Sequence, residues 1–201
     1  CRAIERGVTY FDVIFSMPDY LDNVSAGFRG ERDRVLLAGH SFGGAVVLCL
    51  LDQQACIWTQ GEIAFFHGIQ GAVAISAHIQ PPDDPHSTAP IAIGRTPVML
   101  VSGTADAYTD PGEVDATFSR LEGGAARFLV SLDGVNHYQA ADCLDPGCDN
   151  YEQDAPAEVG HQVALERLGK SFLAFLSWKL GDHPGVLGEL DNDEGITVER
   201  E

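Results

Sequence analysis

The sequence has no long apolar run and few basic residues. No uninterrupted apolar stretch approaches the roughly 20 residues that a membrane-spanning helix requires, so no membrane span is expected. Lys and Arg together number 12 of the 201 residues, against 30 Asp and Glu, which gives a formal net charge of -18. An acidic surface repels the phosphates of nucleic acids and the headgroups of anionic membranes. Neither is therefore expected as a partner.

The N-terminus and the cysteines leave several points open. The chain begins at Cys1 without an initiator Met or a signal peptide, so we expect that upstream residues were removed or are missing. Cytoplasmic and secreted locations both stay open. Of the five cysteines, Cys49 stands in an apolar helical run and is expected to be a buried free thiol. Cys143 and Cys148 stand in a polar loop, either bridged or reduced, and without ligand pairs nearby no metal is expected.

Short apolar runs alternate with helical patterns along most of the chain. Apolar residues make up 45% and charged residues 21%, as in one folded globular domain. Strands are expected at 34–38, 72–76, 97–102 and 126–130, and helices at 10–28, 45–51, 111–122 and 157–180. Apolar strands joined by helices predict a mostly parallel sheet with helices on both faces, a three-layer αβα sandwich. We expect this domain to span residues 1–180, and residues 181–201 to form an acidic tail that is partly ordered at best.

The clearest chemical motif follows the first predicted strand. The strand runs directly into Gly39-His40-Ser41-Phe42-Gly43, which matches the pattern G-x-S-x-G, and an apolar helix follows. This pattern places a serine on a tight strand-to-helix turn that exposes its hydroxyl at the carboxyl edge of a sheet. A backbone N–H after the serine and the positive end of the helix then face the same point, as an oxyanion hole requires. Ser41 is the candidate nucleophile, Phe42 the candidate oxyanion donor and His40 a candidate pocket residue.

Two further polar residues follow later strands. Asp106 ends a Ser-Gly-Thr-Ala-Asp sequence after the third predicted strand, and His137 follows the fourth. Asp110 competes with Asp106, but its position before a helix-starting proline accounts for it as a helix cap. The carboxyl ends of parallel strands meet at one edge of a sheet. We therefore predict a catalytic triad in which His137 takes the proton of Ser41 and Asp106 orients the imidazole.

These segments resemble the α/β-hydrolase superfamily, and more narrowly its dienelactone-hydrolase, chlorophyllase and polyester-cutinase-like branch. The segments that carry the resemblance are Ala38-Gly39-His40-Ser41-Phe42-Gly43-Gly44, Val101-Ser102-Gly103-Thr104-Ala105-Asp106 and Gly134-Val135-Asn136-His137-Tyr138. The chain order Ser, Asp, His is also that of the superfamily, and the resemblance extends over about residues 12–180.

The resemblance implies a central, mostly parallel sheet. It also implies a reaction that needs neither a cofactor nor a metal ion. It implies a small-molecule or lipid- or polyester-like ester as substrate. It also implies a second oxyanion donor on a glycine-bearing loop well upstream of the serine. No such loop precedes Ser41, and the first forty residues leave room for only one helix and one strand. We therefore expect a chain that is truncated at its N-terminus and lacks the early strands of the family.

The substrate pocket and the reaction class have further candidates. The loop from about Ala77 to Thr96 contains four prolines and is expected to shape the pocket. Within it, Ile79, Ile91 and Ile93 are expected to supply apolar surface. The same triad serves peptidases, thioesterases and acyltransferases, and a non-catalytic binding protein of this fold is another alternative. An anion-binding loop is disfavoured, because residues 39–44 lack the P-loop lysine and the spacing of a dinucleotide loop. The expected function is hydrolysis of an ester-like bond through an acyl-enzyme.

Overall fold

The computed structural model describes residues 35–52, 69–79, 89–140, 154–181 and 183–201. All of them belong to the larger of two compact units, Arg34–Glu201. The smaller unit, Cys1–Asp33, lies outside the described residues, and with it the helix predicted at 10–28.

A five-stranded sheet forms the centre of the described fold. Its spatial order is β1-β2-β4-β6-β7. The bounds are β1 Val35–His40, β2 Ile69–Ile75, β4 Val98–Gly103, β6 Arg127–Leu132 and β7 Ile196–Arg200. The first four strands run parallel and β7 pairs antiparallel to β6, so the prediction of a mostly parallel sheet is confirmed. The carboxyl ends of β1, β4 and β6 lie at one edge, and each leads into a segment that carries a predicted site residue.

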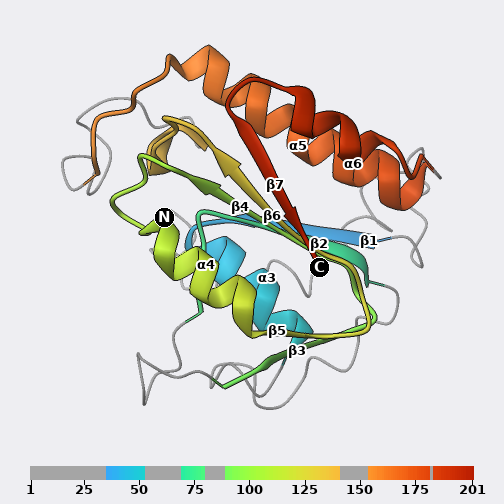
Figure 1. Cartoon of the computed structure of the whole chain (residues 1–201). Coiled ribbons are helices and arrows are strands. Elements are labelled where there is room, and N and C mark those ends of the chain that lie inside the picture. The colour runs from blue at the N-terminus through green and yellow to red at the C-terminus, as the bar shows by residue number, and fades with distance from the viewer. Residues whose placement is uncertain (1–34, 53–68, 80–88, 141–153, 182) are drawn as a thin grey trace, which may run out of the picture. The chain divides into compact units, whose positions relative to one another are not determined.

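Helices pack against both faces of this sheet (Figure 1). Their bounds are α3 Phe42–Leu51 and α4 Pro111–Arg120 on one face, and α5 His161–Leu180 and α6 Val186–Glu189 on the other. Side chains alternate along a strand. Ala72 and Ala74 of β2 therefore pack with α3, whereas Val73 packs in the cluster of α5. Because both faces of β2 are covered, its residues from Gly71 to Ile75 form a continuous apolar run instead of an alternating pattern.

A second, two-stranded sheet lies on the α3 and α4 side of the first (Figure 1). β3 (Ile91–Gly94) pairs in parallel with β5 (Leu121–Gly123). The prediction of a single loop over 77–96 is therefore wrong for the residues of β3. Ile91 and Ile93 are buried while Ala92 and Gly94 are exposed, which is the alternation of a strand. The last predicted residues of the helix that begins at Pro111 belong instead to β5.

The acidic C-terminal segment is part of the fold, so the prediction of a partly ordered tail is wrong. After the single undescribed residue 182, the chain forms α6, a 3₁₀ turn at Leu190–Asn192 and β7. Leu187 and Ile196 are buried in the core cluster beneath α5. Ion pairs hold three of the acidic side chains: Asp193 lies 2.6 Å from Lys170, Asp191 lies 2.8 Å from Arg200, and Glu201 lies 2.6 Å from Arg127. The apolar residues that alternate with these charges are the physical reason that the segment is ordered.

Cys49 also differs from its prediction. It is buried in α3 and disulfide-bonded, so it is not a free thiol. The other four cysteines, including Cys143 and Cys148, lie outside the described residues. Five cysteines allow many pairings, and a pattern of spacings does not select one of them because pairing depends on proximity in the fold.

Candidate active site

Ser41 occupies a strained turn between β1 and α3. Its backbone has φ 56° and ψ -125°, a conformation that residues with a β-carbon rarely adopt and that costs on the order of 1–3 kcal/mol. Two hydrogen bonds hold the turn: the Ser41 N–H donates to the Ile75 carbonyl at 2.8 Å, and the Ala45 N–H donates to the Ser41 carbonyl at 3.1 Å. The turn is so tight that a β-carbon on Gly39 would overlap the carbonyl of Gly43. The glycine two positions before the serine therefore has a steric cause.

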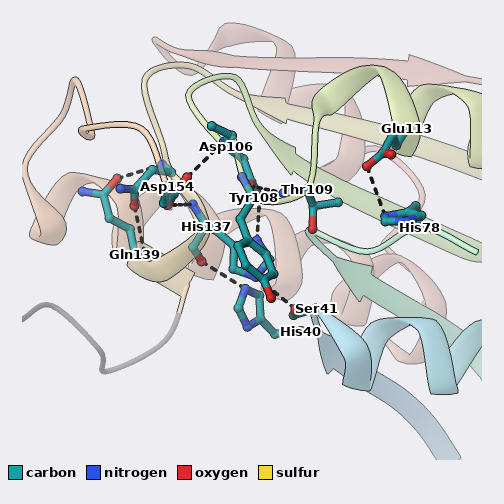
Figure 2. A network of polar contacts seen from close by, with 12 residues as sticks. His40, Ser41, His78, Asp106, Tyr108, Thr109, Glu113, His137, Gln139 and Asp154 are labelled. Carbon is teal, nitrogen blue, oxygen red and sulfur yellow. Dashed lines mark hydrogen bonds and ion pairs between the residues drawn. The ribbon is translucent and has the colours of Figure 1, made fainter. Parts of the chain in front are cut away.

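The structure brings Ser41, Asp106 and His137 together, with His137 between the other two (Figure 2). His137 Nδ1 lies 2.9 Å from Asp106 Oδ2, and His137 Nε2 lies 2.9 Å from Ser41 Oγ. Because a carboxylate can only accept, Nδ1 carries the proton and donates it, so in the neutral ring Nε2 accepts from the serine hydroxyl. The three side chains thus form a continuous series of hydrogen bonds from a buried carboxylate to a serine hydroxyl.

Asp106, and not Asp110, faces His137. Asp106 is 2% exposed, and its side-chain Oδ1 accepts from the N–H groups of Tyr108 at 3.1 Å and Thr109 at 2.7 Å. These two bonds leave Oδ2 directed at the imidazole. Asp110 instead caps α4, where its side chain accepts from the Gly112 N–H at 2.7 Å. Each aspartate therefore has its own local partner.

Hydrogen bonds join the segment that follows β4 to the segment that follows β6. The Ala105 N–H donates to the Val135 carbonyl at 3.0 Å, and the Gly134 N–H donates to Thr104 Oγ1 at 2.8 Å. A β-carbon on Gly103 would overlap the Val135 carbonyl, so only glycine permits this approach. The backbone of Gly134, with φ 68°, makes the turn that leads to the histidine. These contacts fix the segments that carry Asp106 and His137 relative to each other.

The three remaining predicted site residues have different surroundings. His40 donates from Nε2 to the His137 carbonyl at 3.0 Å, and the centroids of the two rings are 4.6 Å apart. Phe42 is the first residue of α3, so its N–H lies at the positive end of the helix, directly after Ser41. The residue is 45% exposed. Ile79 is buried in the apolar cluster of α3 and α4, where it contributes to packing. His40 and Phe42 therefore lie at the site, whereas Ile79 belongs to the core.

The surroundings of His40 keep its ring neutral near neutral pH. Burial, and secondly the neighbouring His137, lower the pKa of His40 from 6.5 to about 4. The hydrogen bond to the His137 carbonyl and the charge of Asp106 favour protonation, but they offset only part of this effect. A neutral His40 with its proton on Nε2 donates a hydrogen bond to the His137 carbonyl without placing a positive charge beside the His137 ring.

Two side chains that bind the backbone around His137 were not predicted. Asp154 accepts from the His137 N–H at 2.8 Å and from the Ala107 N–H at 3.0 Å. Gln139 donates to the Val159 carbonyl at 2.7 Å, which fastens the 3₁₀ turn His137–Ala140 to the segment before α5. Both residues stand in stretches without a motif, and the partners named here are 17 to 47 residues away in the sequence. No sequence signal separates them from ordinary loop residues.

Tyr108 is a further residue at the site that was not predicted. Its ring centroid lies 4.8 Å from that of His137, and the side chain is 41% exposed. It is also 6.1 Å from the ring of Tyr138. The position of Tyr108, two residues after the predicted acid, is a signal that pointed to it. Its exposed ring lies against the imidazole of His137.

Two kinds of feature are absent from the described part of the chain. Among residues 35–52, 69–79, 89–140, 154–181 and 183–201, no group of three or more His, Cys, Asp or Glu side chains is placed to hold a metal ion. Within the same ranges, no helix combines the length and the apolar character that crossing a bilayer requires.

Comparisons with known proteins add no family assignment. No protein-family model matches the chain, and no curated protein matches its sequence.

Proposed function

We propose that the protein is a serine hydrolase with an α/β-hydrolase fold that cleaves a carboxylic ester-like bond. The single observation that carries the proposal is the series of contacts through His137, with 2.9 Å to Ser41 Oγ on one side and 2.9 Å to Asp106 Oδ2 on the other. The strained backbone of Ser41 supports it, because such strain persists where a function requires it. The placement of the three residues after β1, β4 and β6 supports it further.

The reaction follows from the tautomer of His137. Ser41 Oγ attacks the carbonyl carbon of the ester, and its proton moves to His137 Nε2. Asp106 stabilises the imidazolium that forms through the hydrogen bond from Nδ1. When the carbon–oxygen bond to the leaving group breaks, the proton passes from Nε2 to the departing alkoxide. Water then attacks the acyl-enzyme by the same route, which releases the acid and restores the Ser41 hydroxyl.

The developing oxyanion requires a donor near Ser41. The Phe42 N–H stands at the start of the ten-residue helix α3, where the aligned peptide dipoles favour negative charge. We assign it as one oxyanion donor. A single donor of this kind contributes on the order of a hundred- to a thousand-fold to turnover.

Covalent labelling tests the proposal directly. A fluorophosphonate probe should label the protein at Ser41, and p-nitrophenyl acetate should be hydrolysed, while Ser41→Ala should abolish both. A panel of ester, thioester and peptide substrates then separates an esterase from a thioesterase or a peptidase. Absence of labelling in the folded wild-type protein would reject the catalytic reading in favour of a binding protein.

A further inference from the structure

Side chains from two other segments form hydrogen bonds with the backbone of His137. Its carbonyl accepts from His40, the residue directly before the proposed nucleophile, and its N–H donates to Asp154 Oδ2 at 2.8 Å. The second oxygen of Asp154, Oδ1, accepts from the N–H of Ala107 at 3.0 Å and from that of Ala155 at 2.9 Å. Figure 2 shows Asp154 beside the His137 backbone, away from Ser41.

The two loops that Asp154 joins are those of the proposed acid and base. Ala107 directly follows Asp106, and His137 is the base itself, so one carboxylate binds the backbone next to each partner of the Nδ1 hydrogen bond. We propose that Asp154 is a positioning residue, which holds His137 and Asp106 at hydrogen-bonding distance by binding both of their loops at once. This inference rests on the proposed serine hydrolase function.

Charge and geometry make Asp154 suited to this role. Hydrogen bonds from N–H groups to a carboxylate are shorter and stronger than those to a neutral acceptor. The three bonds use both oxygens, and their partners lie 17 and 47 residues away, apart from the adjacent Ala155. The Ala105–Val135 bond fastens the same loops nearer the ends of the strands. Asp154 therefore fixes the part of these loops that lies farther from the strand ends, where a small displacement of the backbone moves the imidazole.

Two variants separate positioning from folding. Asp154→Ala removes both acceptors, whereas Asp154→Asn keeps the shape but leaves only one oxygen for two loops. Asp115→Asn is the matched control, because it removes the same charge from an exposed position on α4. For each protein we would measure the thermal midpoint, kcat and KM with p-nitrophenyl acetate, the rate of fluorophosphonate labelling, and the deshielded NMR proton of the His137 Nδ1–H···Asp106 bond.

We expect Asp154→Ala to lower kcat on the order of a hundred-fold with KM nearly unchanged, because displacement of a catalytic group by about 1 Å has an effect of this size. Its deshielded proton should weaken or vanish, Asp154→Asn should be intermediate, and Asp115→Asn should match the wild type. Wild-type kcat and a wild-type proton signal in folded Asp154→Asn and Asp154→Ala would overturn the inference. If the wild type itself neither turns over esters nor reacts with the probe, the proposed function fails, and the proton signal alone then decides the role of Asp154.

Discussion

A β-carbon on Gly39 would overlap the carbonyl oxygen of Gly43, because the two residues face each other across the turn that carries Ser41. Gly44 is confined as well: its β-carbon would lie 2.5 Å from that of Ala77 and 2.9 Å from the Gly39 carbonyl oxygen. A β-carbon on Gly43, in contrast, meets no atom within 4 Å. Of these three glycines, the turn needs the first and the last.

Alanine substitutions at the three glycines should therefore differ. We expect Gly39→Ala and Gly44→Ala to lower the free energy of unfolding by about 1–3 kcal/mol through overpacking. Gly43→Ala should be neutral or raise it by up to about 1 kcal/mol, because alanine has the higher helix propensity. Urea unfolding of each variant measures the difference. Equal losses at Gly39 and Gly43 would show that the close approach does not constrain the turn.

The two aspartates after β4 should respond differently to conversion to asparagine. Asp106→Asn should lower kcat by about 10⁴-fold, because the amide no longer holds the productive tautomer of His137. Asp110→Asn should leave kcat unchanged and alter stability by only a few tenths of a kcal/mol, since Asn caps helices nearly as well as Asp. Steady-state hydrolysis of p-nitrophenyl acetate measures both. The reverse result would mean that Asp110 supplies the acid when substrate is bound.

The elements that carry the site could be predicted because their signals are local. An apolar strand before Gly39 and an apolar helix after Ser41 define the turn, and Pro111 after Asp110 identifies a cap. Asp154 has no such signal, because its role depends on contacts with the loops of Asp106 and His137, which only the fold brings near it. Long-range pairing likewise hid β3, whose partner β5 lies beyond α4.

The C-terminal segment shows how composition misleads when it is read before periodicity. Its many acidic residues suggested a solvated tail, yet Ile196 and Val198 alternate with polar residues as in a strand. The alternation was readable, but the partner strand β6 was not, and a single short strand is not stable alone. Pairing with β6 and burial of Leu187 beneath α5 supply what the local pattern lacks.

The packing of this segment predicts a large cost for Leu187→Ala. Leu187 is 3% exposed within the cluster of α5, whereas Leu173 on α5 is 61% exposed. Removing a buried leucine side chain leaves a cavity and costs about 2–5 kcal/mol. The same change at Leu173 should stay within about 0.5 kcal/mol. Chemical denaturation of the two variants compares identical substitutions. If Leu187→Ala lowers the free energy of unfolding as little as Leu173→Ala does, residues 183–201 lie outside the cooperative fold.

His40 should make stability depend on pH on the acid side of neutrality. Burial and the neighbouring His137 lower its pKa from 6.5 to about 4, so the unfolded chain binds this proton more tightly than the folded protein. Stability therefore rises with pH across this window. The contribution of a neutral His40 is fully present above the unfolded pKa of 6.5 and is lost as the pH falls toward about 4. A shift of this size corresponds to about 3 kcal/mol.

Comparison with His40→Gln isolates this contribution from that of the other titrating groups. The glutamine amide can donate to the His137 carbonyl in place of Nε2, but it does not titrate. Measured by urea unfolding at about pH 7 and about pH 4.5, the stability of the wild type relative to His40→Gln should fall by about 2–3 kcal/mol. A difference that does not change with pH would mean that His40 is protonated as readily in the folded protein as in the unfolded chain. The conclusion that His40 is neutral beside His137 would then be wrong.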